Sequence, residues 1–153
     1  MATTDRAGLV SSCRRIVIKL GTRVLTRADG TLATERLTRI IDASAAARQD
    51  GRDVLIVSSG AVGLGRDALN LSDAPLDLST RQACAAVGQG QLMSLYAERF
   101  GAAKLCVGQV LLTRADFDDR RRYLNLRTTL LTMLRLGVIP IINENDAVAT
   151  DEL

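Results

Sequence analysis

The sequence of 153 residues contains no histidine and no tryptophan. The absence of histidine excludes Ser-His-Asp and Cys-His nucleophilic sites, histidine-ligated metals and imidazole acid–base chemistry within the chain. Aromatic residues make up only 3% of the sequence, so the stacking platforms that bind single-stranded nucleic acid are nearly absent and no nucleic-acid partner is expected. Any chemistry in this chain therefore depends on lysine, arginine, carboxylates, hydroxyls and backbone amides.

Cysteine and long apolar runs are also scarce. Cys13, Cys84 and Cys106 are odd in number and widely spaced, which is typical of reduced thiols in a cytoplasmic protein and not of a disulfide framework or a zinc site. No apolar run approaches the roughly 20 residues of a membrane span, and the first residues lack the pattern of a secretory signal. We therefore expect a cytoplasmic protein with no membrane partner.

What the chain does have is an alternation of short apolar strands and helical segments. After a flexible leader at residues 1–13, the patterns predict strands at residues 14–20, 53–57, 105–112 and 138–142, with helices between them. Thr34 is the expected N-cap of the first helix, and Ser79 with Gln82 forms a capping-box pattern before a later one. The repeated order predicts an α/β fold, a three-layer αβα sandwich with a mainly parallel sheet.

Three residues fit this pattern poorly. Gly88 and Gly90 interrupt the predicted helix at residues 79–100, where each costs about 1 kcal/mol relative to alanine. Either the helix breaks there or another segment packs very close to it. Pro140 lies inside the fourth predicted strand although it cannot donate a ladder hydrogen bond. The strand is retained because isoleucine residues surround the proline.

Polar residues follow each of the four predicted strands. In a parallel α/β sheet, ligands bind outside the carboxyl ends of the strands, so these residues are the candidate site. Together they hold a cation, hydroxyls, glycine amides and carboxylates. The four ends are Lys19-Leu20-Gly21-Thr22, Ser58-Ser59-Gly60-Ala61, Thr113-Arg114-Ala115-Asp116 and Asn143-Glu144-Asn145-Asp146.

The first strand end has the character of an anion site, most simply for phosphate. Lys19 leaves a buried strand, and its ammonium must find water or an anion. Gly21 lets the backbone approach a ligand closely, and Thr22 follows it. The alternative is a strand whose lysine simply extends into solvent at the sheet edge.

Two other strand ends are open to two interpretations each. Gly60, Gly63 and Gly65 lie at a strand-to-helix turn, where backbone N–H groups hold an anion or where helices pack closely. Their order is neither the dinucleotide fingerprint nor a Walker motif. Residues 143–146 suit recognition of a substrate ammonium or a metal-linked carboxylate, and they equally suit helix capping and turns.

Taken in this order, the segments resemble the glutamate 5-kinases of the amino acid kinase family. The resemblance covers nearly the whole chain from Arg15, and its last segment is the most specific. The matching segments are Ile18-Lys19-Leu20-Gly21-Thr22, Ser58-Ser59-Gly60-Ala61, Ala86-Val87-Gly88-Gln89, Gly108-Gln109, Leu111-Leu112-Thr113-Arg114-Ala115-Asp116, Tyr123-Leu124-Asn125, and residues 139–149.

The resemblance implies ATP-dependent phosphorylation of the γ-carboxylate of L-glutamate to L-glutamyl 5-phosphate, the first step of proline biosynthesis. It implies ATP and Mg²⁺, proline as feedback inhibitor, and a homo-oligomer. Lys19 would be catalytic and would contact the ATP phosphates, with Gly21 and Thr22 beside it. No residue is assigned as a metal ligand. The implied glutamate-binding residues are Ser59, Gly60, Ala61 and Asp146, with Asn143 and Asn145 as further candidates.

The chain departs from the family pattern at its end. The pattern continues into a glycine-aspartate-asparagine-aspartate segment and then into a half that binds the ATP base and supplies a second phosphate lysine, whereas this sequence stops at Asp151-Glu152-Leu153. We therefore expect residues 14–153 to form the glutamate-side lobe of a kinase domain, as a truncated product, a partial sequence or one part of a split enzyme. One alternative is a non-catalytic module that binds glutamate or proline. Another is a uridylate or aspartate kinase, against which residues 58–61 and 143–146 argue.

Overall fold

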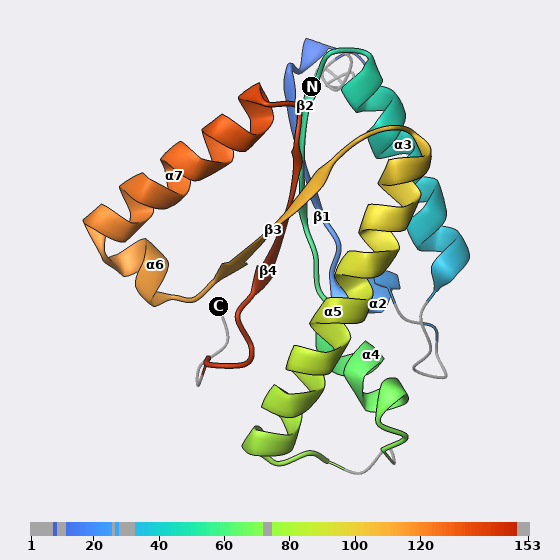
Figure 1. The fold of residues 1–153 in the computed structure, drawn as a ribbon, viewed down its shortest axis with the longest axis vertical. Coiled ribbons are helices and arrows are strands. Elements are labelled where there is room, and N and C mark those ends of the chain that lie inside the picture. Colours follow the sequence, from blue (N-terminus) through green and yellow to red (C-terminus); the bar gives the residue numbers. More distant parts are fainter. Residues whose placement is uncertain (1–7, 9–11, 26, 28–32, 72–74, 150–153) are drawn as a thin grey trace, which may run out of the picture.

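A computed structural model describes residues 8, 12–25, 27, 33–71 and 75–149. In this part of the chain, four strands form one parallel sheet in the order β1-β2-β4-β3 (Figure 1). The strands agree with those predicted to within two residues at each end, which confirms the α/β class, while most of the expected leader lies outside the described residues. They are β1 (Arg15–Lys19), β2 (Asp53–Val57), β3 (Val107–Leu112) and β4 (Ile139–Glu144).

Helices lie on both faces of the sheet and complete the predicted three layers. Figure 1 shows α3 (Thr34–Gln49) and α5 (Leu78–Ala102) on one face and α7 (Arg120–Arg135) on the other. Two one-turn helices, α2 (Thr22–Leu25) and α6 (Ala115–Asp118), were not predicted because four residues are too few to show helical periodicity. The remaining helix is α4 (Ala61–Ala68). Within the described residues, no helix combines the length and apolar character needed to cross a membrane.

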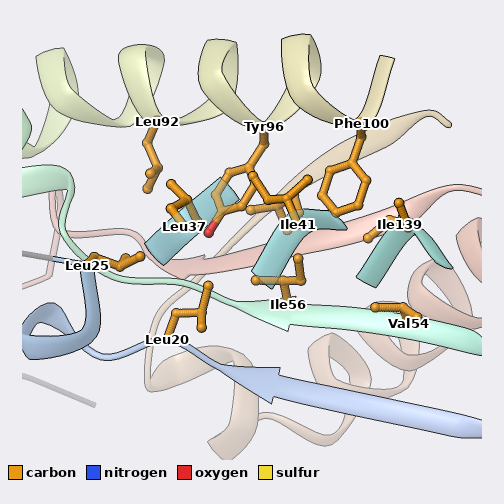
Figure 2. Close-up of a cluster of buried hydrophobic side chains, with 12 residues drawn as sticks. Leu20, Leu25, Leu37, Ile41, Val54, Ile56, Leu92, Tyr96, Phe100 and Ile139 are labelled. Atoms are coloured by element: carbon orange, nitrogen blue, oxygen red, sulfur yellow. The ribbon is translucent and has the colours of Figure 1, made fainter. Parts of the chain in front are cut away.

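The hydrophobic core lies between the sheet and helices α3 and α5 (Figure 2). Tyr96 and Phe100 of α5 are fully buried, and their stacked rings have centroids 6.4 Å apart. Figure 2 shows them above the strands, together with Leu92 of the same helix. Burial of these apolar side chains is the main force that holds α5 on the sheet. The other members of the cluster are Leu20, Leu25, Leu37, Ile41, Ala45, Val54, Ile56, Ile139 and Ile141.

The opposite face of the sheet is more open. Among the residues of α7, Leu134 alone is buried. A largely apolar groove of about 690 Å³ separates the rest of α7 from the sheet, with Leu126 and Leu130 on one wall and Leu55 and Val57 on the other. The two faces of the sheet therefore differ, because one is closed by a packed core and the other borders a groove.

Both predicted helix caps are wrong. Ala33 is the N-cap of α3 and makes no side-chain capping bond, so Thr34 is the first helical residue. Asp77 caps α5 by accepting a hydrogen bond from the Thr80 N–H at 2.7 Å. The Ser79 hydroxyl donates to the same carboxylate at 3.2 Å and does not act as the cap. The ionised carboxylate is the stronger acceptor at this helix start.

Helix α5 runs without a break through Gly88 and Gly90. A Cβ added at Gly88 would collide with the Ala61 carbonyl oxygen at the start of α4, and one added at Gly65 of α4 would collide with the Cys84 carbonyl oxygen of α5. The expectation that another segment packs very close is therefore confirmed at Gly88. Nothing lies within 4 Å of a Cβ at Gly90, so no close contact among the described residues requires a glycine there.

Pro140 is accommodated inside β4 by the way this strand pairs. The Ile139 N–H donates to the Cys106 carbonyl at 2.9 Å, on the β3 side. The nitrogen of the next residue therefore faces β2, where pairing begins only at Ile56 and Ile141. The missing N–H of Pro140 removes no hydrogen bond from the pairing with β3.

The close contact between α4 and α5 yields a stability prediction. We expect Gly88→Ala to lower the free energy of unfolding by at least about 1–3 kcal/mol, because the added methyl group has no room against the backbone of α4. Gly90→Ala is the matched control, and it should raise the free energy by up to about 1 kcal/mol because alanine favours a helix interior. Urea unfolding followed by circular dichroism measures both. Equal effects of the two substitutions would contradict the packing described here.

Candidate functional site

Polar residues at the carboxyl ends of β1, β2 and β4 meet around one cavity. Thr22, which follows β1, and Ser59, which follows β2, share a hydrogen bond between their hydroxyl oxygens at 2.9 Å. The adjoining cavity has a volume of about 480 Å³. Most of the predicted site residues line it, namely Thr22, Ser59, Gly60, Ala61, Asn143 and Asp146.

The other predicted residues border neighbouring spaces. Lys19, the exposed last residue of β1, lines the groove beside α7 together with Gly21. This groove and the cavity share Thr22, Ser59, Asn143 and Glu144, so the two spaces meet at the ends of the strands. Asn145 lines a smaller cavity of about 270 Å³, which also borders Asp146.

The third strand end does not join the site. Asp116 accepts hydrogen bonds from the Thr113 N–H at 2.7 Å and from the Thr113 hydroxyl at 2.8 Å. These bonds, more than the nearby Arg122 guanidinium, hold the pKa of the Asp116 carboxyl below its usual range. The expectation of a four-membered site is therefore wrong at this point, because the polar end of β3 closes a local turn, and residues 113–116 line neither the cavity nor the groove.

Gly60 places the start of α4 at the cavity. Its φ of 92° lies in the left-handed region, which glycine adopts without strain. The chain then enters α4, whose first residues Ala61, Val62 and Gly63 line the cavity. In the first turn of a helix the N–H groups have no acceptor within the helix. These amides, together with the positive end of the helix dipole, favour an anion in the cavity.

Two buried hydrogen bonds fasten the strand ends to α5. The Ser58 and Tyr96 hydroxyl oxygens lie 2.9 Å apart. The Asn143 side-chain amide donates to the side-chain carbonyl of Gln89 at 2.8 Å. Burial raises the pKa of the Tyr96 phenol, and its hydrogen bond with Ser58 acts in the opposite direction. Ser59 follows the anchored Ser58, and Asp146 lies in the same short segment as the anchored Asn143. Helix α5 therefore sets the positions of predicted ligands that follow β2 and β4.

The hydrogen bond between Asn143 and Gln89 also fixes the orientation of the Asn143 side chain. Because its NH₂ group donates to Gln89, its carbonyl oxygen is the group left to accept a hydrogen bond at the cavity. The Gln89 NH₂ group is buried and has no hydrogen-bond partner among the described residues. Gln89 lines the smaller cavity that also borders Asn145.

The cavity carries charges of both signs. Arg81 of α5 contributes a guanidinium, and Glu144 and Asp146 contribute carboxylates. Lys19 adds an ammonium on the side of the groove. Within the described residues, no group of three or more histidine, cysteine, aspartate or glutamate side chains could hold a metal ion. This arrangement suits a small ligand that bears both positive and negative charge.

Sequence reasoning assigned no role to Arg81 or Gln89, which the structure places at the site. A signal was available, because Arg81, Ala85 and Gln89 are spaced four residues apart and so lie on one face of a helix. In the sequence, Arg81 lies between the two residues of the Ser79 and Gln82 pattern, and Gln89 lies between two glycines and within one segment of the family resemblance. Only the strand order shows that this helix face meets the ends of β2 and β4.

Comparison with known proteins adds the family context. Residues 14–153 match the model of the amino acid kinase family. Among similar proteins, the glutamate 5-kinase of Moorella thermoacetica is 51% identical over 144 residues, which cover 94% of this chain and 38% of that protein. The glutamate 5-kinases of Geobacter metallireducens and Myxococcus xanthus are 47% and 46% identical, over 97% and 99% of this chain. The chain spans about two fifths of the length of these relatives.

The buried amide pair yields a second stability prediction. We expect Gln89→Leu to lower the free energy of unfolding by about 1–3 kcal/mol, because it leaves the buried Asn143 donor without an acceptor. Gln91→Leu, at an exposed position of the same helix, is the control and should change the value by less than about 0.5 kcal/mol. Urea unfolding measures both variants. Equal values for Gln89→Leu and Gln91→Leu would show that the amide pair does not anchor β4.

Proposed function

This chain belongs to the amino acid kinase family, and we propose that residues 14–153 form the glutamate-binding lobe of a kinase that phosphorylates the γ-carboxylate of L-glutamate. ATP would be the phosphoryl donor and L-glutamyl 5-phosphate the product, as the first step of proline biosynthesis. The similar proteins named above are glutamate 5-kinases, and this supports the choice of substrate. We further propose inhibition by proline, assembly into a homo-oligomer and a cytoplasmic location.

The observation that carries this proposal is that the groove and the cavity meet at Thr22 and Ser59, with the ammonium of Lys19 on one side and the carboxylate of Asp146 on the other. On one side lies Lys19, an exposed cation at the end of β1, with Gly21 beside it. On the other side lies the cavity with the carboxylate of Asp146. A phosphate held by the lysine would thus face an amino acid held in the cavity, with the two hydroxyls between them.

The proposed reaction suits a chain without histidine. The acceptor carboxylate is already ionised at neutral pH, so no general base has to remove a proton from it. Phosphoryl transfer depends mainly on positioning and on stabilising charge at the moving group. Lys19 and the N–H groups at the start of α4 would provide that stabilisation from fixed positions.

The residues around the cavity fit the Mg²⁺ that accompanies ATP. This ion binds chiefly to phosphate oxygens and water and takes only one or two protein carboxylates. Glu144 lines both the cavity and the groove that holds Lys19, so it would hold the ion. When bound, Mg²⁺ neutralises charge on the phosphates. Asp146 lines the cavity but not the groove, and it would bind the ammonium of glutamate.

A second candidate function is a non-catalytic module that binds glutamate or proline. It is favoured by the presence of a single lysine at the site, since the other lysine of the chain, Lys104, precedes β3 and lies at the amino ends of the strands. Isothermal titration calorimetry separates the two candidates. Binding of the amino acid without binding of Mg-ATP would favour the module.

The proposed kinase activity is tested by trapping glutamyl phosphate as its hydroxamate, with purified chain, Mg-ATP, L-glutamate and hydroxylamine. We expect Lys19→Ala to lower the rate by roughly 100- to 1,000-fold, the usual loss when one charge-stabilising contact is removed. Lys104→Ala is the matched control and should keep the rate of the unsubstituted chain.

Circular dichroism must show that all three proteins are folded. Turnover of Lys19→Ala at the rate of the unsubstituted chain would remove this lysine from the mechanism. A folded chain that binds L-glutamate but forms no hydroxamate would instead favour the binding module.

A further inference from the structure

Gln89 is a buried polar residue of α5 that has no part in the proposed reaction. Its side chain is 8% exposed, and its carbonyl oxygen accepts a hydrogen bond from the Asn143 side-chain amide at 2.8 Å. Gln89 lines the smaller cavity but neither the main cavity nor the groove, whereas Asn143 lines both of the latter. The contact through which Gln89 reaches the candidate site is therefore its hydrogen bond with Asn143.

The two amides stand in rows of side chains that otherwise build the hydrophobic core. On β4, Ile139, Ile141 and Asn143 are every second residue, so they share one face of the sheet. On α5, Gln89 precedes the core residue Leu92 by three positions, and both are buried. Figure 2 shows Leu92 directed toward the sheet. The amide pair thus occupies the place where the core would continue toward the ends of the strands.

This polar pair lowers stability relative to an apolar pair at the same positions. The Gln89 NH₂ group is buried and has no hydrogen-bond partner among the described residues. A buried donor without an acceptor is unfavourable, whereas two apolar side chains of similar shape would fill the space without that loss. A buried polar group that stability does not explain is typical of a functional site.

The hydrogen bond leaves one group of Asn143 for a ligand. The Asn143 carbonyl oxygen has no hydrogen-bond partner among the described residues, and unlike the Gln89 NH₂ group it is not enclosed by the protein. Because Asn143 lines the main cavity, this oxygen is an acceptor at its wall. An amide oxygen pairs with an N–H donor and repels a carboxylate, so it suits the ammonium of an amino acid.

We propose that Gln89 is a positioning residue that makes the cavity select ligands with an ammonium group. By accepting from the Asn143 NH₂ group, it keeps the Asn143 carbonyl oxygen available to the ammonium of the amino acid substrate. This inference rests on the proposed function. Without Gln89, the Asn143 NH₂ group would turn toward the water of the cavity to find an acceptor, and the carbonyl oxygen would lose its fixed place.

The test compares L-glutamate with glutarate by isothermal titration calorimetry on the whole chain. Glutarate keeps both carboxylates but has no ammonium. We expect the unsubstituted chain to bind L-glutamate at least about 10-fold more tightly, since a hydrogen bond to a charged group contributes about 10- to 100-fold. In Gln89→Leu this preference should fall by about 10-fold, because the carbonyl oxygen is no longer held in place.

Two further variants separate positioning from a purely structural role. Gln89→Glu keeps an oxygen that accepts from the Asn143 NH₂ group, so we expect it to retain the preference. Gln91→Leu, at an exposed position of the same helix, should retain it as well. A purely structural role for Gln89 would weaken both ligands equally in Gln89→Leu and would leave their ratio unchanged.

A second measurement needs no variant. Nuclear magnetic resonance of the unsubstituted, ¹⁵N-labelled chain follows the side-chain NH₂ signals of Asn143 and Gln89. At saturation, L-glutamate should shift both signals more than glutarate does, because an ammonium bound to the Asn143 carbonyl oxygen polarises the amides hydrogen-bonded in series with it. Equal shifts with the two ligands would overturn the proposal even if Gln89→Leu does not fold.

The outcomes for the two proposals are distinct. Equal affinity of the unsubstituted chain for L-glutamate and glutarate overturns the role of Gln89 but leaves the proposed function in place. The same holds for a folded Gln89→Leu that keeps the preference, and for a Gln89→Glu that loses as much of it as Gln89→Leu. Failure of the folded, unsubstituted chain to bind L-glutamate overturns the proposed function and this inference with it.

Discussion

The attachment of α5 to the ends of β2 and β4 is the constraint on which the site depends. Tyr96 holds Ser58 and Gln89 holds Asn143, each through a hydrogen bond between buried side chains. A polar group left unpaired at such a depth is costly, so these bonds specify one position of the helix along the strands. These anchored residues determine the positions of the proposed ligands Ser59 and Asp146, which lie close to them in the sequence.

The same helix determines where α4 begins. Gly88 lets the backbone of α4 approach α5 more closely than any side chain would permit, and Ala61 is the residue it meets. The first amides of α4 consequently face the cavity that Arg81 borders from α5. Hydroxyls, amides and charges are thus brought together by helix packing and strand order, and a reaction that requires positioning more than proton transfer is suited to such a site.

Much of this fold follows from local sequence patterns, because apolar period and length mark the four strands and the three long helices. Other features depend on contacts distant in sequence. Ser79 resembles a cap, but the carboxylate of Asp77 competes better for the same N–H group. Nothing local places β4 between β2 and β3. For this reason the polar end of β3 was expected at the site and is absent from it, whereas Arg81 and Gln89 were not expected and are present.

Nuclear magnetic resonance of the ¹⁵N-labelled chain, titrated with L-glutamate, tests most directly whether three strand ends and α5 form one amino acid site. We expect the amide signals that shift to belong to the residues around the cavity, and those of α7 to stay in place. Shifts confined to α7 and the groove beside it, or no shifts in a folded chain at millimolar glutamate, would contradict this. The residues expected to shift are Thr22, Ser59, Gly60, Ala61, Arg81, Asn143 and Asp146.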